Sequence, residues 1–173
     1  MINWFIERRK ESRRRKKLYE NVVSEIPKLS PNQAKGLFIK ISETFSDEFL
    51  IKSDDDDGTF EEIKHLLPRY LKDYYKTFPS VDFSWNEYVI SRNFIKPSEL
   101  HSDCLCIGDN GPFGEIVIIP EKEEVYVLYS EDTYTEICEC LKDGAKSIYN
   151  FILEMLCVNE KICEYVKKNL EIT

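Results

Sequence analysis

The sequence predicts an α+β fold, in which an antiparallel β-meander sheet packs with helices and follows an N-terminal helical extension. Apolar residues recur at helical spacing in the first and last parts of the chain, whereas residues 104–130 follow a period of two. Helical and strand patterns occupy separate blocks, which is typical of α+β proteins and not of alternating βαβ units. A hydrophobic content of 42% and an aromatic content of 13% over 173 residues suffice for a real core.

The N-terminus is strongly basic. No apolar residue occurs from Glu7 to Lys17, so a helix there would be polar on all sides. Residues 1–20 contain eight Lys or Arg and three Glu, a net charge of +5, which leaves −13 for the remainder of a chain whose total is −8. We therefore expect residues 1–17 to form a basic leader and residues 18–173 to form a single, strongly acidic α+β domain.

Capping signals mark the start of the next helix. Apolar residues at helical spacing end at Pro27. Ser30 then stands at the N-cap, with Pro31 at the first helical position and Gln33 completing a capping box. We expect this helix to carry an apolar stripe as far as about Leu50.

A second helical block follows an acidic stretch. The four consecutive acids of residues 54–57 predict a solvated loop, because the ligand spacing of a calcium-binding loop is not present. Thr59 and Glu62 then form another capping box. Pro68 interrupts this helix, and Pro79 ends the helical part of the first half.

Three short runs rich in β-branched and aromatic residues predict the strands of the meander. They read "CLCIG" (104–108), "EIVII" (115–119) and "VYVLYS" (125–130). The segment "PEKEE" suits a hairpin turn after a strand that Pro120 ends. Residues 80–100 mix strand and turn signals, so the sequence does not predict their secondary structure.

Two helices are expected after the meander. Thr133 with Glu136 predicts the cap of a long helix whose inward-facing residues extend to Met155. A final short helix is expected from about Glu160 to Leu170, because its apolar residues again follow helical spacing.

Three of the six glycines lie within residues 108–114, "GDNGPFG". A phosphate-binding loop runs from a strand into a helix, because the helix N-terminus supplies backbone N–H groups. Here a strand follows, and Pro112 lacks one of the N–H groups that such a loop needs. Asp109, Asn110 and Gly111 favour a tight turn. The segment therefore predicts a β-hairpin and not a nucleotide site.

The six cysteines predict reduced, buried thiols. Nothing in the sequence supports secretion, the usual setting of disulfides. The spacing is C-x-C, whereas structural zinc usually uses C-x2-C or C-x4-C knuckles. Cys104 and Cys106 would share a buried face of a strand. Cys138 and Cys140 would point to different sides of a helix, so we expect no metal and no cofactor.

A cysteine–histidine enzyme is the catalytic alternative. His101 lies three residues before Cys104 in "HSDC", with Asp103 between them. A nucleophilic cysteine needs a base and an orienting group. Cys104 in a strand would be buried, and proximity in sequence alone is weak support. We therefore expect no catalysis, with a small Cys/His hydrolase as the alternative.

Several stretches of the chain resemble a known family. They are "LLPRYLKDYYKTF" (66–78), "FIKPSEL" (94–100), "LCIGDNGPFGEIVIIPEKEEVYVLYSED" (105–132) and "TEICECLKDGAKSIYNFILEML" (135–156). Over about residues 60–157 the chain resembles the SUKH superfamily, the group of Syd-like and Knr-like proteins. Its members typically show a Leu-Pro plus aromatic helix, a Gly/Asp-rich turn between strands, a "VY" strand that ends in an acidic residue, and a helix with a late F-(I/L)-L.

The resemblance implies a bacterial immunity protein that neutralises a partner toxin by direct contact, or a regulatory scaffold of the same fold. The acidic body agrees independently, because an acidic inhibitor associates faster with a basic toxin domain. Candidate contact residues, an aromatic and acidic cluster with hot-spot composition, are Asp82, Trp85, Glu87 and Tyr88. The alternative is that Trp85 and Tyr88 belong to the core.

Charge and hydropathy limit the other partners. A body with a charge of −13 repels nucleic acid, so no nucleic-acid partner is expected for it. The leader, an aromatic tip before a basic block, could rest on an anionic membrane or on nucleic acid. We favour a solvated helix, or one that folds back on the acidic body. No apolar run approaches the roughly 18 residues of a membrane span, and no signal peptide is recognised, so a cytoplasmic location is expected.

Overall fold

The computed structural model describes residues 2–52, 59–83, 88–110, 114–129, 137–138 and 147–170. The chain divides into two compact units: Met1–Ile41 with Tyr149–Thr173, and Ser42–Ile148. The two ends of the chain therefore belong to the same unit. The single domain over residues 18–173 stays a prediction. No helix within the described residues combines the length and the apolar character that a membrane span requires.

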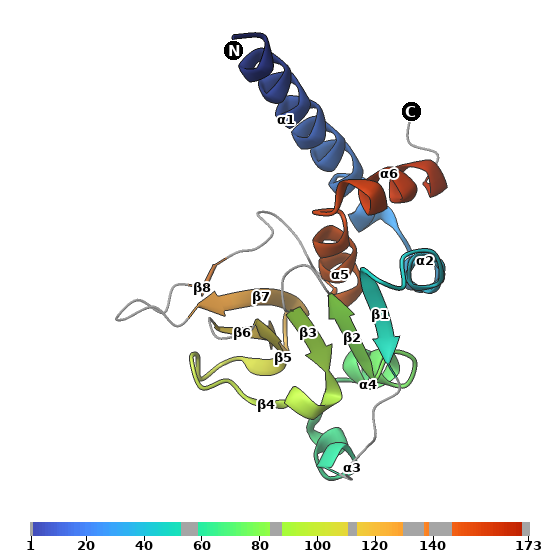
Figure 1. The fold of residues 1–173 in the computed structure, drawn as a ribbon. Coiled ribbons are helices and arrows are strands. Elements are labelled where there is room, and N and C mark those ends of the chain that lie inside the picture. Colours follow the sequence, from blue (N-terminus) through green and yellow to red (C-terminus); the bar gives the residue numbers. More distant parts are fainter. Residues whose placement is uncertain are drawn as a thin grey trace. The chain divides into compact units, whose positions relative to one another are not determined.

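The first unit is helical (Figure 1). It is built from residues of α1 Ile2–Val23, the 3-10 helix η1 Ile26–Lys28, α2 Pro31–Thr44, α5 Ile148–Leu156 and α6 Glu160–Asn169. Helix α1 continues through the predicted leader boundary at residue 17 without a break. In the core of this unit, Phe38 of α2 is fully buried and its ring centroid lies 5.8 Å from that of Tyr149 in α5. The predicted C-terminal helix is confirmed as α6.

The predicted capping box at the start of α2 is confirmed. The Gln33 amide N–H donates to Ser30 Oγ over 3.3 Å, and the Ser30 amide N–H donates to Gln33 Oε1 over 2.9 Å. Pro31 is the first residue of the helix, as expected. The box satisfies two backbone donors that the helix itself leaves unpaired.

The predicted end of α2 is wrong. The helix ends at Thr44, and Phe49 and Leu50 begin the strand β1 Phe49–Lys52. The amide N–H groups of Glu48 and Phe49 both donate to the Phe45 carbonyl over 2.9 Å, which closes a turn after the helix. Phe45 and Phe49 have helical spacing, so periodicity alone could not reveal this turn.

In the part of the chain that the structure describes, the second unit contains eight strands in one sheet. They are β1, β2 Ser80–Phe83, β3 Tyr88–Ser91, β4 Lys96–Pro97, β5 Leu105–Asn110, β6 Gly114–Ile119, β7 Glu124–Tyr129 and β8 Ile137–Cys138. The pairings are antiparallel, in the order β1-β2-β3-β5-β6-β7-β8, with β4 beside β5. The predicted α+β class with an antiparallel sheet is therefore confirmed.

Short helices complete this unit. They are α3 Thr59–Ile63, α4 Arg69–Tyr75 and the 3-10 helices η2 Lys64–Leu66 and η3 Arg92–Phe94. The helical pattern is interrupted at Pro68 and ends before Pro79, as predicted. The predicted acidic loop, residues 54–57, lies outside the described residues.

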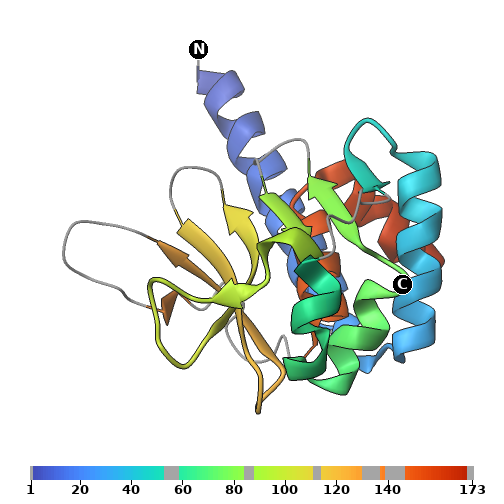
Figure 2. The same ribbon diagram turned by 90° about the horizontal axis from the view of Figure 1, so that it is seen from below.

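The predicted meander is confirmed as β5, β6 and β7, which lie side by side in both views (Figures 1 and 2). The β6–β7 turn has the predicted position, and Glu123 adopts a φ of 57° there. The β5–β6 turn begins later than predicted, because Asp109 and Asn110 still belong to β5. Residues 111–113 lie outside the described residues.

The prediction of a long helix from Thr133 is wrong at residues 137–138, the first part of this segment that the structure describes. Residues 137–138 form β8, which pairs with β7, so Cys138 lies in a strand and not in a helix. Pairing with a neighbouring strand overrides the local helical pattern. The predicted helix is confirmed only from Ile148, as α5. Its cap and Cys140 lie outside the described residues.

Helix α4 is attached to the sheet by two tyrosine hydroxyls. The Tyr75 hydroxyl donates to the carbonyl of Ile107 in β5 over 3.3 Å. The Tyr70 hydroxyl donates to the carbonyl of Pro120, directly after β6, over 3.2 Å. These bonds fix the aromatic helix against the strands of the meander.

Gly108 lies inside β5 and not in the turn. A Cβ at this position would lie 2.4 Å from the Val89 carbonyl oxygen and 3.2 Å from Ile116 Cδ1. The register of β5 against β6 also shifts between Cys106 and Gly108. A glycine is therefore required here because β3 approaches closely.

Candidate functional site

A row of directly paired residues crosses the sheet of the second unit. It contains one residue from each of seven strands: Leu50, Asp82, Val89, Asp109, Glu115, Leu128 and Ile137. Directly opposite residues of antiparallel strands share a face, so these positions lie on one face of the sheet. Their neighbours Phe83, Ile90 and Ile116 are fully buried and belong to the other face.

A large part of this row is accessible. Leu50 is 41% exposed, and the side chain of Asp82 is 31% exposed. The next three members are also partly exposed: Val89, Asp109 and Glu115. At β7 the row is covered, because Leu128 is buried in a cluster with Cys104. The accessible part therefore extends from β1 to β6.

Three carboxylates lie in the accessible part, and we call Asp82, Asp109 and Glu115 the acidic row. Lys52 forms an ion pair with Asp82. Asp109 and Glu115 are directly opposite each other on β5 and β6, and no described basic side chain forms an ion pair with either. Like charges in this position destabilise a sheet. A local conflict of this kind is typical of a functional surface.

The carboxylate of Glu115 is held in place by the turn that follows β4. The Ser98 hydroxyl donates to Glu115 Oε2 over 2.5 Å, and the Glu99 amide donates to Oε1 over 3.3 Å. Ser98 Oγ in turn accepts from the amides of Leu100 and His101, over 3.1 and 3.0 Å. The charge of Glu115 therefore has a fixed position before any partner binds.

Of the four predicted contact residues, the structure describes the backbone positions of Asp82 and Tyr88. Asp82 lies in the acidic row, opposite Val89. Tyr88 is opposite Phe83, and this register places it on the other face of the sheet from Asp82. Trp85 and Glu87 lie outside the described residues. The contact set as a whole stays a prediction, with Asp82 on the accessible face.

Sequence reasoning missed Asp109 and Glu115. The sequence pattern predicts a turn at Asp109 and a strand that begins at Glu115. The two acids are equally far from Pro112, so a hairpin centred there pairs them directly. This symmetry is the signal that could have identified the pair.

His101 and Cys104, the pair considered as the catalytic alternative, are in contact, but the surroundings of the thiol are unfavourable for catalysis. Cys104 Sγ lies 3.6 Å from His101 Nδ1, and the Asp103 amide donates to the same Nδ1 over 3.3 Å. Burial, followed by the charges of Asp103 and Glu115, raises the pKa of Cys104. A nucleophilic cysteine requires a lowered pKa. The contact is therefore better suited to stabilising the turn than to activating Cys104 as a nucleophile.

The cysteines and acids form no evident metal centre in the described part of the chain. No group of three or more His, Cys, Asp or Glu side chains there could hold a metal ion. The thiols that the structure describes are free and buried: Cys104, Cys106, Cys157 and Cys163. Cys106 lies in the strand core, as predicted, and burial raises its pKa to about 11.

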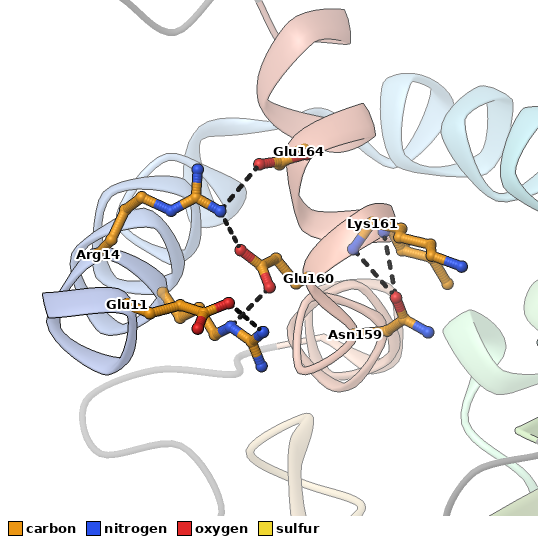
Figure 3. Close-up of polar contacts among 8 residues, drawn as sticks. Glu11, Arg14, Asn159, Glu160, Lys161 and Glu164 are labelled. Atoms are coloured by element: carbon orange, nitrogen blue, oxygen red, sulfur yellow. Dashed lines mark hydrogen bonds and ion pairs between the residues drawn. The ribbon is translucent and has the colours of Figure 1, made fainter. Parts of the chain in front are cut away.

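The basic helix α1 makes ion pairs with α6 in the first unit (Figure 3). Arg14 Nη2 lies 2.7 Å from Glu160 Oε1 and 4.0 Å from Glu164 Oε1. Arg15 Nε lies 2.7 Å from Glu160 Oε2, and Arg15 also pairs with Glu11 within α1. Part of the basic charge is thus neutralised within the unit, which supports the expected folding back onto acidic residues.

In comparisons with models of protein families, with curated proteins and with solved structures, the chain matched none. The class of the protein therefore follows from its own elements: an α+β protein with an antiparallel sheet that carries an acidic row on an accessible face. The SUKH resemblance stays an expectation from the sequence.

Proposed function

We propose that the protein binds a basic protein partner by direct contact and neutralises it, as an immunity or antitoxin-type protein does, without catalysis. The observation that carries this proposal is the acidic row on the accessible face of the sheet. Two of its charges, Asp109 and Glu115, form no ion pair with a basic side chain that the structure describes, and they complement Lys and Arg side chains of a basic toxin domain.

The dimensions of the row fit a protein better than a small molecule. From β1 to β6 the accessible part spans five neighbouring strands, and strands are spaced by about 4.8 Å, so it is roughly 19 Å long. The apolar side chains of Leu50 and Val89 alternate with the acids along it. Apolar contacts next to charges are what a specific protein interface requires.

The charge distribution also favours rapid association. Outside residues 1–20 the chain carries a net charge of −13. A field of this sign attracts a basic partner over distances of about 10 Å and increases the association rate at low salt. In this proposal the protein acts in the cytoplasm, where free thiols such as Cys104 and Cys106 remain reduced.

The test begins with the full-length protein immobilised and exposed to an extract of its own source cells. The captured partner is identified, expressed and purified, and its dissociation constant is measured for each variant. Asp109→Asn combined with Glu115→Gln removes two charges but keeps a hydrogen-bond acceptor for Ser98. Each lost charge contact costs about 1 kcal/mol, so we expect the affinity to fall by about tenfold or more, with a weaker salt dependence.

Asp73→Asn is the matched control, because this acid lies on the exposed surface of α4 and pairs only with Arg69 and Lys76 among the described residues. It should bind as the wild type does. Equal affinity of the wild type and the double variant would contradict the proposed surface. A partner that is harmless to cells would instead indicate a regulatory scaffold of the same fold.

A further inference from the structure

The accessible part of the row is a narrow strip that crosses the strands. On one side of it, the next residues on the same face of β2, β3, β5 and β6 are all buried: Ser80, Ser91, Cys106 and Val117. From β2 to β6 the covered region therefore begins directly beside the row. A partner that contacts several members of the row has to follow this line from strand to strand.

The chemistry of the strip changes along its length. Its members from β1 to β6 are Leu50, Asp82, Val89, Asp109 and Glu115. Lys52 already neutralises Asp82. The last two acids form no ion pair with a basic side chain that the structure describes. The strip therefore offers two apolar contacts, with a satisfied ion pair between them, and a negatively charged end at β5 and β6.

The spacing of the members matches an α-helix. They lie on adjacent strands, so they are about 4.8 Å apart, and the four steps span about 19 Å. In a helix, residues three or four apart share one face, and four such steps take 14 residues and about 21 Å. An extended peptide repeats its side chains on one face every 6.8 Å or so, and its four steps would cover about 27 Å. A helix therefore fits the strip much better than a strand.

The twist of a sheet agrees with this fit. Adjacent strands are rotated by about −20 to −25° relative to each other. The contact stripe of a helix drifts by about −10° for each step of 3.5 residues, because one turn takes 3.6 residues. Both rotations are left-handed about an axis that crosses the strands. The side chains of a helix along the strip would therefore turn in the same sense as the strands that they meet.

We propose that the strip binds one α-helix of the partner, which lies across β1 to β6 with basic residues at positions i and i+3 and apolar residues at i+7 and i+14. The basic pair meets Glu115 and Asp109, and the apolar residues meet Val89 and Leu50. The direction follows from the helix dipole, whose positive N-terminal end is favoured beside the two acids. This inference rests on the proposed function, because it specifies which part of the basic partner contacts the acidic row.

The probe is a synthetic, alanine-rich peptide of about 18 residues, kept helical by a hydrocarbon staple on its far face. It carries Lys at i and i+3 and Leu at i+7 and i+14. The control peptide has the same composition, but its Lys residues stand at i+2 and i+5, on the opposite face. The dissociation constant of each is measured by NMR titration of the full-length, isotope-labelled protein, which also identifies the contacted residues.

We expect the patterned peptide to bind about tenfold or more tightly than the control, because only its charges reach both acids. It should shift the amide signals of Val89, Asp109 and Glu115. In Asp109→Asn/Glu115→Gln its affinity should fall to that of the control peptide, whereas in Asp73→Asn it should not change. Equal affinities of the two peptides, shifts confined to other surfaces, or no binding at about 1 mM would each overturn the inference.

The captured partner separates this inference from the proposed function. If the affinity of the partner depends on Asp109 and Glu115 while the two peptides bind equally, the proposed function stands and the helix is refuted. If the patterned peptide binds the row while the partner is indifferent to both acids, the proposed function fails and the strip remains a site for a basic helix.

Discussion

Glu154 in α5 is a buried carboxyl group whose titration should control stability. Its residue is only 4% exposed, and burial raises its pKa to about 7 from the ordinary 4.5. The folded protein therefore keeps the proton at pH values where the unfolded chain has lost it. The free energy of unfolding should fall as the pH rises from about 4.5 to about 7 and should be constant above that.

The magnitude follows from the two pKa values. At pH 5 the group costs the folded state less than about 1 kcal/mol, because it is largely protonated there. At pH 8 the cost reaches about 3 kcal/mol, since the carboxyl is then largely ionised in both states and the folded state carries the full cost of a buried charge. Glu154→Gln removes this cost, so its advantage over the wild type should grow by about 2 to 3 kcal/mol between these pH values.

The assay is urea unfolding followed by far-ultraviolet circular dichroism at pH 5, 6, 7 and 8. Glu164→Gln is the matched control, because its side chain on α6 is 56% exposed and the substitution removes no buried carboxyl group. If the difference between Glu154→Gln and the wild type were constant with pH, the carboxyl of Glu154 would be solvated and the reasoning from burial refuted.

Substitutions at three further positions test the packing, and each is measured by the midpoint of urea unfolding. Gly108→Ala should cost about 2 kcal/mol or more, because the new Cβ would lie 2.4 Å from the Val89 carbonyl oxygen; an unchanged midpoint would show that β3 can move away. Asn159→Ala should cost about 1 kcal/mol, because its side chain caps α6, and Asn159→Ser should recover most of it. Tyr75→Phe should cost about 1 kcal/mol through the lost hydrogen bond to Ile107, and no loss would mean that this bond contributes nothing.

The features that the sequence predicts correctly are those that depend on neighbours in the chain. The capping box of Ser30 and Gln33 spans four residues, and both hydrogen bonds form as expected. The β6–β7 hairpin likewise depends on a short turn between two strands. In such cases a few adjacent residues contain all the information that the structure needs.

The errors arise where strand pairing decides the structure. Phe49 continues the helical spacing of α2, yet it forms a strand because β2 offers a partner, with Phe49 opposite Phe83. Ile137 follows a helical pattern and is drawn into β8 by its pairing with Leu128. Neither partner can be read from the local pattern, because the pairing joins segments that lie apart in the sequence.

The sequence could predict only part of the candidate site. The sequence indicates the acidic character of the body and Asp82, but the row that connects Asp82 to Glu115 depends on the register of four strands. A register is set by the hydrophobic pattern of the whole sheet and by its turns, and a shift of one residue would have moved each acid to the buried face.

The most direct test of the central claim is the growth of cells that produce the captured partner. Cells that also produce the wild-type protein or Asp73→Asn should grow. Cells with Asp109→Asn/Glu115→Gln should stop growing at equal protein levels, because the partner is released from the acidic row. Full protection by the double variant would contradict the claim that this face of the sheet neutralises the partner.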